Sequence, residues 1–319
     1  MYVGGEMYAE VTDRAAARAV FAKSVQRVEI ETHSYCNRRC TYCPNVIGDR
    51  IGPNQRLEPA LWHKILDGLA EVDYAGHLVL NYYNEPLADL AILDRIREAR
   101  ARAPKARIMI YSNGDYLDRN LIEQLADAGL DYLHISIHLK RGEKYSDLYV
   151  VNRTNEISVR MGISAQIHKL RSNEYSIARA AHPKLEIEVR GINFERHGTD
   201  RGGLIDDIHT ETGRTAPCFF PFAHVVVSYD GRLAPCCHIR VDRPEHAAYA
   251  YGDLRDYDSI FQAFTSAPAA AWRRELISAK LKRSPCDTCA AGKLEGNGAK
   301  VAEEAYQTFV VQPHAAASS

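Results

Sequence analysis

The chain has 319 residues, of which 46% are hydrophobic and 25% charged, and its formal net charge is −1 at pH 7. This composition is typical of soluble globular proteins and excludes the strongly basic surface that binding to nucleic acid or an anionic membrane requires. The first twenty residues contain acidic side chains and no apolar signal-peptide core, and no later run has transmembrane length. We therefore expect a cytoplasmic protein with no nucleic-acid or membrane partner.

Strands and helices alternate after a lead-in at 1–24. Apolar runs predict strands at 27–35, 77–83, 106–114, 132–139, 163–170 and 184–194. Amphipathic spacing predicts helices at 57–70, 88–103 and 117–128, another within 146–161 and a short one at 175–181. This alternation indicates an α/β fold, a partial (β/α)6 TIM-like barrel with its chemistry at the carboxyl ends of the strands.

The pattern changes after the sixth predicted strand. A polar, glycine-rich loop leads to a predicted hairpin at 223–237, with Asp230–Gly231 at its turn. A helix is expected around 259–278, and a loose tail after about 292. We therefore divide the chain into a lead-in (1–24), a barrel (25–200), a C-terminal domain (201–292) and a tail (293–319).

Three cysteines follow the first predicted strand at once, as Cys36, Cys40 and Cys43 in C-x3-C-x2-C spacing. Three thiolates on one loop can hold three irons of a 4Fe–4S cluster and leave the fourth iron open to a substrate or cofactor. The absence of an export signal argues against disulfides among the eight cysteines. The alternative is a set of buried structural cysteines with chance spacing.

The run CNRRCTYC, with Tyr42 before its last cysteine, resembles the signature of the radical S-adenosylmethionine (SAM) superfamily. The resemblance implies that Cys36, Cys40 and Cys43 hold the cluster, whose open iron binds SAM, and that Tyr42 covers the adenine. It also implies reductive cleavage of SAM to a 5′-deoxyadenosyl radical, which abstracts hydrogen from an unactivated C–H bond.

Further motifs of this family occur in the expected order. The family's Gly-Gly-Glu-Pro reads Tyr-Asn-Glu-Pro here, so a tyrosine and Asn84 replace the glycines, and Glu85 keeps the carboxylate for the SAM ammonium group. A polar turn in YSNG resembles the one that faces the SAM ribose. The residues that the resemblance assigns to SAM are Tyr42, Asn84, Glu85, Ser112, Asn113, Gly114, Ser136 and Gln166. Arg190 alternates in phase with Glu188 on the sixth predicted strand, so we expect it to reach the SAM carboxylate or, as an alternative, an anionic substrate. For Ser136, a hydroxyl bonded within its own sheet is the alternative.

The later cysteines resemble the auxiliary-cluster domain called Twitch, the short form of SPASM. The resemblance implies one auxiliary 4Fe–4S cluster with four ligands, Cys218, Cys236, Cys286 and Cys289. A structural zinc site with the same thiolates is the alternative. Cys237 remains free and is a candidate catalytic residue, able to return a hydrogen atom to a substrate radical. It could instead be a small buried hydrophobe or exchange roles with Cys236.

The family members that this chain resembles most are aminocyclitol and aminoglycoside dehydrogenases and epimerases. The resemblance implies hydrogen abstraction from a carbinol carbon of a small polar natural product, followed by oxidation to a ketone or by epimerisation. It also implies an electron donor such as flavodoxin or ferredoxin. A radical SAM peptide-modifying enzyme is one alternative, and a non-catalytic iron–sulfur electron-transfer protein is another.

Overall fold

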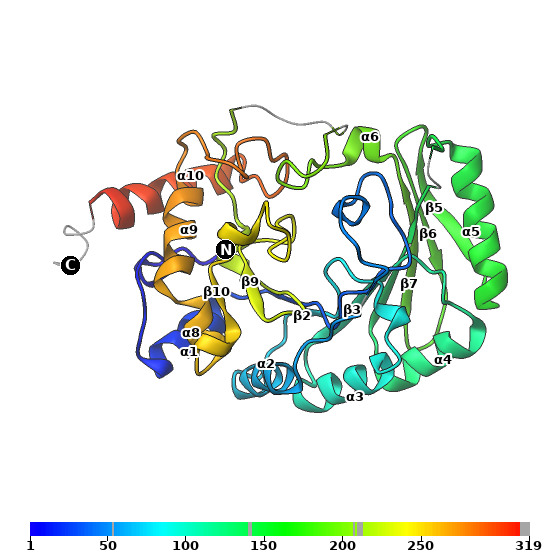
Figure 1. Ribbon diagram of the computed structural model, residues 1–319, viewed down its shortest axis with the longest axis horizontal. Helices are drawn as coiled ribbons and strands as arrows, with labels where there is room; N and C mark the ends of the chain where they lie inside the picture. The colour runs from blue at the N-terminus through cyan, green and yellow to red at the C-terminus, as the bar shows by residue number, and fades with distance from the viewer. Residues whose placement is uncertain (53, 140–141, 207, 209–212, 313–319) are drawn as a thin grey trace.

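One curved sheet of ten strands organises the computed structural model, which describes residues 1–52, 54–139, 142–206, 208 and 213–312 (Figure 1). The strand order is β10-β9-β8-β1-β2-β3-β4-β7-β6-β5. The six central strands, from β8 to β7, are parallel, while β10-β9 and β6-β5 add antiparallel edges. The strands are β1 (Arg27–Ile30), β2 (His77–Val79), β3 (Arg107–Ser112), β4 (Tyr132–Ile137), β5 (Ala165–Arg171), β6 (Tyr175–Ala180), β7 (Glu186–Ile192), β8 (His224–Val227), β9 (Arg232–Ala234) and β10 (Gly252–Asp253).

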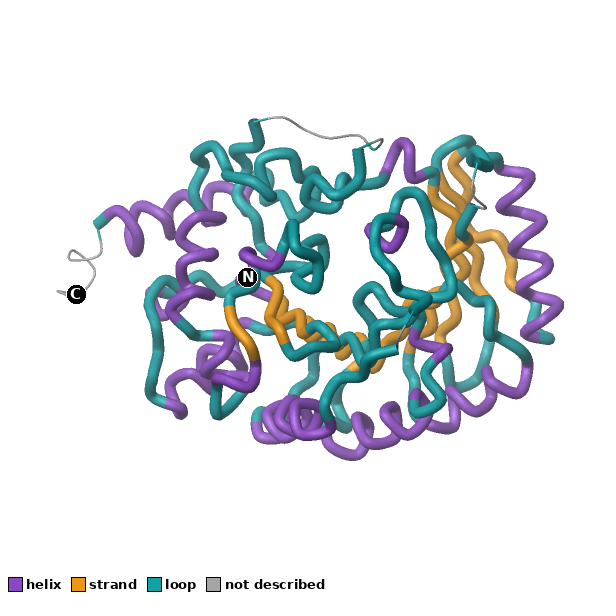
Figure 2. The backbone as a smooth tube through the Cα atoms, viewed as in Figure 1, coloured by secondary structure: helices purple, strands orange, loops and turns teal. Residues whose placement is uncertain are grey.

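Helices cover the outer face of this sheet, with α2, α3, α4 and α5 along its convex side (Figure 1). Loops gather on the opposite, concave side (Figure 2). The α-helices are α1 (Arg14–Ser24), α2 (Pro59–Glu71), α3 (Ile92–Arg102), α4 (Arg119–Ala128), α5 (Asp147–Met161), α6 (Phe194–His197), α7 (Phe220–Ala223), α8 (Ile260–Phe264), α9 (Ala267–Ile277) and α10 (Asn297–Tyr306). None of the helices in the described ranges is both long and apolar enough to cross a membrane.

The barrel was predicted correctly through its first four strands. The next three strands follow β4 in the order β7-β6-β5, and not in the order of the sequence. The predicted helix at 175–181 is wrong, because Tyr175–Ala180 forms β6, paired antiparallel with both β5 and β7. Its buried residues alternate along the strand, and pairing on both sides outweighs the helix propensity of its alanines. As a result β7, and not β5, lies beside β4.

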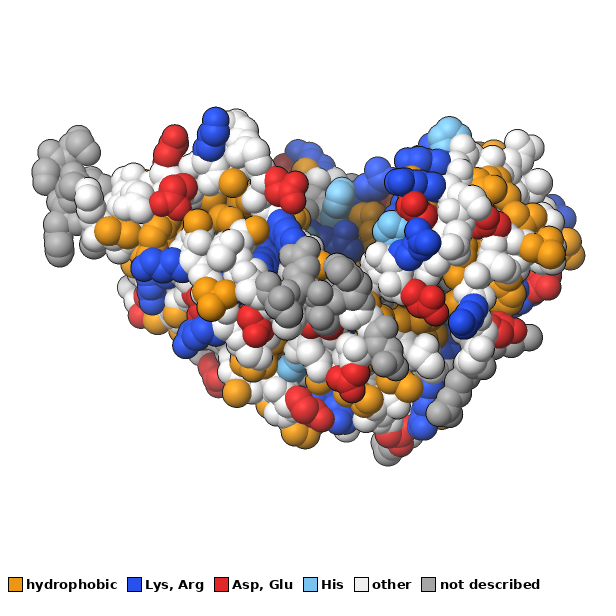
Figure 3. Space-filling model, turned by 90° about the horizontal axis from the view of Figure 1, so that it is seen from above, with side chains coloured by type: hydrophobic (Ala, Val, Ile, Leu, Met, Phe, Trp, Pro, Cys, Tyr) orange, Lys and Arg blue, Asp and Glu red, His pale blue; other side chains and the backbone are white. Residues whose placement is uncertain are grey.

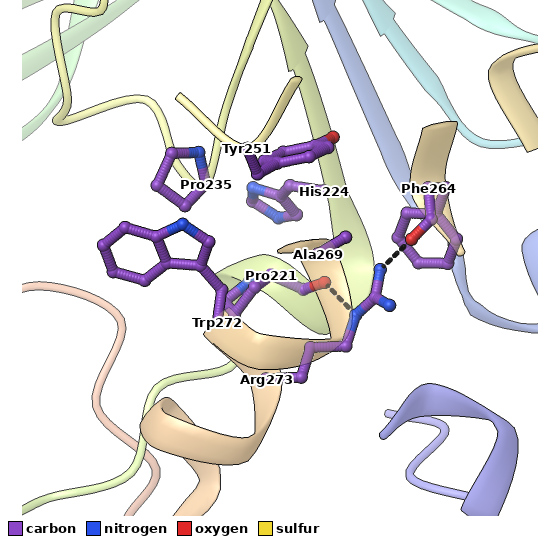
Figure 4. Close-up of a pocket in the computed structure, with 8 residues that line it drawn as sticks. All are labelled: Pro221, His224, Pro235, Tyr251, Phe264, Ala269, Trp272 and Arg273. Carbon is purple, nitrogen blue, oxygen red and sulfur yellow. Dashed lines mark hydrogen bonds between the residues drawn. The ribbon is translucent and has the colours of Figure 1, made fainter. Parts of the chain in front are cut away.

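The C-terminal part is joined to the barrel through the same sheet, since β8 pairs in parallel with β1. The helix expected at 259–278 is two helices, because Ser266 caps α9 by accepting from the Ala269 backbone N–H. Arg273 of α9 is buried and donates to the carbonyls of Pro221 (2.8 Å) and Phe264 (2.6 Å), which ties together α7, α8 and α9 (Figure 4). The expected loose tail contains α10, whose Ala302 and Ala305 are buried.

Candidate active site

A cleft of about 390 Å³ opens on the concave side of the sheet, at the carboxyl ends of the parallel strands. Seen from above, the molecule is hollowed near its middle, and basic and histidine side chains show in the hollow (Figure 3). All three cysteines of the predicted cluster loop line the cleft. Of the residues predicted to contact SAM, the cleft is lined by Tyr42, Asn84, Glu85, Ser112, Asn113, Ser136 and Arg190.

Glu85 is held by the polar turn that follows β3. Its carboxylate accepts from Ser112 Oγ (2.6 Å) and from the backbone N–H groups of Asn113 (2.7 Å) and Leu87 (3.1 Å). Burial raises the pKa of Glu85 to about 7, although these hydrogen bonds favour its charged form. Gly114 has φ +72°, and a Cβ there would meet Ile135 at 2.7 Å, so the turn requires glycine. The Glu85 motif and the polar turn at Ser112–Gly114 are therefore joined by hydrogen bonds into one structural unit.

Tyr42 lies on one wall of the cleft within a stack of rings. Its ring stacks on Phe194 with centroids 3.9 Å apart, and its hydroxyl lies 2.9 Å from His138 Nδ1. Burial lowers the pKa of His138 to about 3 and that of His134 to about 4, so both imidazoles are neutral at pH 7. The stack gives a flat apolar surface of the kind that an adenine ring packs against.

Gln166 was predicted to contact SAM, but the fold places it away from the cleft. It is exposed on β5, an edge strand that β6 and β7 separate from β4. The prediction assumed that the fifth strand in sequence also follows β4 in space. Arg190 of β7 takes that place instead, opposite Ser136, and pairs with Glu188.

The four cysteines predicted to hold the auxiliary cluster influence one another. Burial raises the pKa of Cys236 well above its usual value, and Cys237, Cys286, Cys289 and Cys218 raise it further. Among the described residues, no group of three or more His, Cys, Asp or Glu side chains is arranged to hold a single metal ion. The effect of Cys218, Cys286 and Cys289 on the pKa of Cys236 shows that the four thiols are close enough to interact electrostatically.

Arg214, which sequence reasoning missed, is buried beside these cysteines. It donates to the carbonyls of Cys289 (3.1 Å) and Pro217 (3.2 Å), and it helps to lower the pKa of the Cys218 thiol against the effect of burial. A buried cation of this kind suits a group of thiolates. A lone arginine in a polar loop gives no periodic signal by which it could have been found.

Cys237 lies where the cluster loop, the β2 turn and the β8–β9 hairpin meet. Its carbonyl accepts from the Tyr83 hydroxyl at 3.1 Å. Burial raises the pKa of its thiol to about 12, so the sulfur keeps its proton at pH 7. Cys237 does not itself line the cleft, but its neighbours Tyr83 and Arg201 do.

These side chains fit the cofactors that the sequence implies. Three thiols and a carboxylate converge on one cleft, and the buried amide Nδ2 of Asn84 has no hydrogen-bond partner there. An unsatisfied buried donor of this kind is suited to a bound polar group.

Comparisons with known proteins agree with this geometry. The model of the radical SAM superfamily matches residues 30–139, and that of SPASM, an iron–sulfur cluster-binding domain, matches residues 218–290. The S-adenosyl-L-methionine-dependent 2-deoxy-scyllo-inosamine dehydrogenase of Niallia circulans is 24% identical over 214 residues, which cover 67% of this chain and 74% of that protein. The GTP 3′,8-cyclase of Chlorobaculum tepidum is 29% identical over 143 residues, 43% of this chain and 40% of that protein.

A solved structure, BtrN in complex with AdoMet and 2-DOIA, has the same fold, with a TM-score of 0.57 at 21% identity. The match covers 82% of this chain and 92% of BtrN. The predicted resemblance is thereby confirmed. The chain therefore contains a radical SAM domain, matched over residues 30–139, and a C-terminal iron–sulfur cluster-binding domain of the SPASM/Twitch group, matched over residues 218–290.

Proposed function

We propose that this chain oxidises a carbinol carbon of a small polar, sugar- or cyclitol-like molecule to a ketone. The observation that carries the proposal is a cleft that combines the cluster loop with the Glu85 turn and an inner wall of Asn81, Tyr82 and Tyr111. Amide and phenol groups suit a polyol, because each can exchange hydrogen bonds with a hydroxyl. The similarity to a 2-deoxy-scyllo-inosamine dehydrogenase supports the same class of substrate.

The cofactors in this proposal are SAM, one cluster on Cys36, Cys40 and Cys43, and one auxiliary cluster on Cys218, Cys236, Cys286 and Cys289. When bound, the first cluster in its reduced state would supply the electron that cleaves SAM to the 5′-deoxyadenosyl radical, and the auxiliary cluster in its oxidised state would accept the second electron from the substrate. The protein's own side chains bind and orient SAM. Glu85 offers its carboxylate to the SAM ammonium group, Ser112 and Asn113 hold that carboxylate, and Tyr42 with Phe194 packs against the adenine.

The test uses anaerobically reconstituted protein with dithionite, SAM and a panel of cyclitols and sugars. We expect 5′-deoxyadenosine from the wild type and none from Cys40→Ala. We also expect a product two mass units lighter than the substrate that turns over. A wild-type protein with its full iron content that forms no 5′-deoxyadenosine would refute the proposal and favour an electron-transfer role.

Epimerisation is a second candidate, favoured by the free thiol of Cys237 beside two residues of the cleft wall. In that reaction the Cys237 S–H bond breaks as a new C–H bond forms on the opposite face of the substrate carbon. The sulfur radical then takes one electron and one proton, the electron coming from the reductant. An epimerase incorporates solvent deuterium into its product and loses this with Cys237→Ala, whereas a dehydrogenase does neither.

A further inference from the structure

Arg201 is a cation in the cleft wall that forms no ion pair with a described carboxylate, although the buried Glu29 interacts with it electrostatically from farther away. Its side chain lines the cleft, and its buried Nε atom has no hydrogen-bond partner. Its Nη1 reaches only His238 Nδ1, at 3.5 Å, and no ion pair joins Arg201 to any Asp or Glu in the described ranges. Arg201 as a whole is partly exposed, but its Nε is withdrawn from water without an acceptor, which costs free energy that a bound anion would recover.

The other charged side chains that line the cleft are already satisfied. Arg38 pairs with Asp115 at 2.6 Å, and Arg190 pairs with Glu188. Glu85 accepts three hydrogen bonds and is the carboxylate proposed for SAM. Within the described part of the cleft wall, one cation therefore has no counter-charge, and no carboxylate is left to receive a substrate amine.

The loop that carries Arg201 is fixed before any ligand binds. Arg201 has φ +51°, a left-handed conformation that is uncommon for a side chain of this size, and such strain gathers at functional sites. On one side of Arg201, Thr199 Oγ1 lies 3.1 Å from His238 Nδ1, and the Asp200 carboxylate accepts from Thr288. On the other, His246 Nε2 donates to the Gly202 carbonyl at 2.9 Å. The fold thus holds the backbone of Arg201 in a strained conformation beside the cleft.

The position of Arg201 indicates which ligand it serves. Besides burial, the groups that influence the pKa of Arg201 most are Tyr83, Cys43 and Cys237, so all three lie close to it. It therefore lies near both the cluster loop and the turn of Cys237, in the wall of the same cleft. The SAM carboxylate is a second possible anion, which the experiment below separates from a substrate.

We propose that the substrate of this enzyme carries an acidic group, a carboxylate or a phosphate, which pairs with Arg201. This inference rests on the proposed function and narrows its substrate class from small polar sugars and cyclitols in general to those that carry an acidic group. A guanidinium fork matches both acids through two parallel hydrogen bonds.

The test compares four probes with one sugar frame: D-glucose, D-glucosamine, D-glucuronate and D-glucose 6-phosphate. Each is titrated by calorimetry into the SAM-loaded holoenzyme under anaerobic conditions. We expect the two acids to bind at least about tenfold more tightly than glucose, because a charged hydrogen-bond pair contributes this much or more. Arg201→Gln should abolish that preference and Arg201→Lys should keep part of it. Arg196→Gln, an exposed arginine five residues earlier, should bind as the wild type does.

Several results would overturn the inference. In one, neither acid binds the wild type at 10 mM, which is roughly the weakest useful affinity. In another, Arg201→Gln keeps the same preference for acids as the wild type. If the variant instead loses affinity for SAM and keeps the preference for acids, Arg201 serves the SAM carboxylate. If only the electron paramagnetic resonance signal or potential of a cluster changes, Arg201 balances cluster charge. Formation of 5′-deoxyadenosine by the wild type tests the proposed function separately. If 5′-deoxyadenosine forms but one of these results is found, the proposed function stands and only the inference about Arg201 is removed.

Discussion

Replacing Asp242 by Asn should destabilise the fold, because Asp242 lies between two buried arginines. Its carboxylate accepts from Arg50 Nη2 (2.9 Å) and from Arg240 through Nη2 (2.6 Å) and Nε (2.8 Å). All three side chains are at most 6% exposed. Arg50 also pairs with Glu31, so the substitution leaves Arg240 as the cation without a carboxylate. The pair is broken in a place that water does not reach.

The magnitude follows from the ionisation of Asp242. Burial opposes its charge, but the hydrogen bonds from Arg240 and the charge of Arg50 hold its pKa at about 2, below its ordinary value of 3.8. This difference corresponds to about 2.5 kcal/mol. Breaking a buried pair typically costs about 3–5 kcal/mol, and Asn keeps one acceptor oxygen. We therefore expect Asp242→Asn to lose about 2–3 kcal/mol of unfolding free energy.

Urea unfolding of the anaerobic holoprotein, followed by tryptophan fluorescence, measures this loss. Because the pKa of Asp242 is lowered in the folded state, its contribution is complete above pH 4 and disappears only as the pH falls through about 2. The loss should therefore be the same at pH 6 and pH 8. Asp94→Asn is the control, since Asp94 is 73% exposed and its pair with Arg97 should contribute less than about 1 kcal/mol. Equal losses for both variants would refute the reasoning.

Three further substitutions give expected outcomes. SAM should bind about tenfold more tightly at pH 8 than at pH 6, because Glu85, whose pKa is raised to about 7, must ionise to receive an ammonium group; calorimetry should find no such dependence in Glu85→Gln. Cys36→Ala should reduce bound iron from about eight to about four atoms per chain and abolish 5′-deoxyadenosine, and unchanged iron would contradict the two-cluster assignment. Tyr83→Phe should lose about 1 kcal/mol in urea unfolding, since its hydroxyl donates to the Cys237 carbonyl; no loss would mean that this bond contributes nothing.

The first half of the site was predictable because its residues follow strands in order. Each of the motifs at Cys36, Glu85 and Ser112 comes directly after an apolar run, and parallel strands bring their carboxyl ends to one edge. Local patterns therefore sufficed to place these three motifs around one cleft. The assignment of each residue to SAM remains a prediction, as do the domain boundaries at 25–200 and 201–292.

The part of the site that follows β4 in the sequence could not be predicted, because strand order is a property of the whole sheet. The segments at 163–170 and 184–194 both have the pattern of a strand beside β4, and only the pairing of β6 with both decides between them. Gln166 was misplaced for this reason, whereas Arg190 was not. Arg201 and Arg214 were missed because their partners lie far away in sequence, at His238 and Cys289.

The tyrosine that replaces a family glycine has a structural consequence. The Tyr83 carbonyl accepts a hydrogen bond from Asn45 Nδ2 (2.9 Å), and the Tyr83 hydroxyl donates one to the Cys237 carbonyl. Asn45 follows the cluster loop and also accepts from Arg240, which belongs to the segment after Cys237. A closed chain of contacts thus joins the cysteine loop to the turn at Cys237.

Displacing either part would break several buried hydrogen bonds at once, each costly to leave unpaired. Glycine at this position could make the backbone contact but not the hydroxyl bond to Cys237. Tyr83 therefore fixes the spacing between the loop of Cys36, Cys40 and Cys43 and the hairpin segment at Cys237. In the proposed reaction a substrate radical must meet either an electron acceptor or a hydrogen donor before it escapes, so we expect that spacing to influence which product forms.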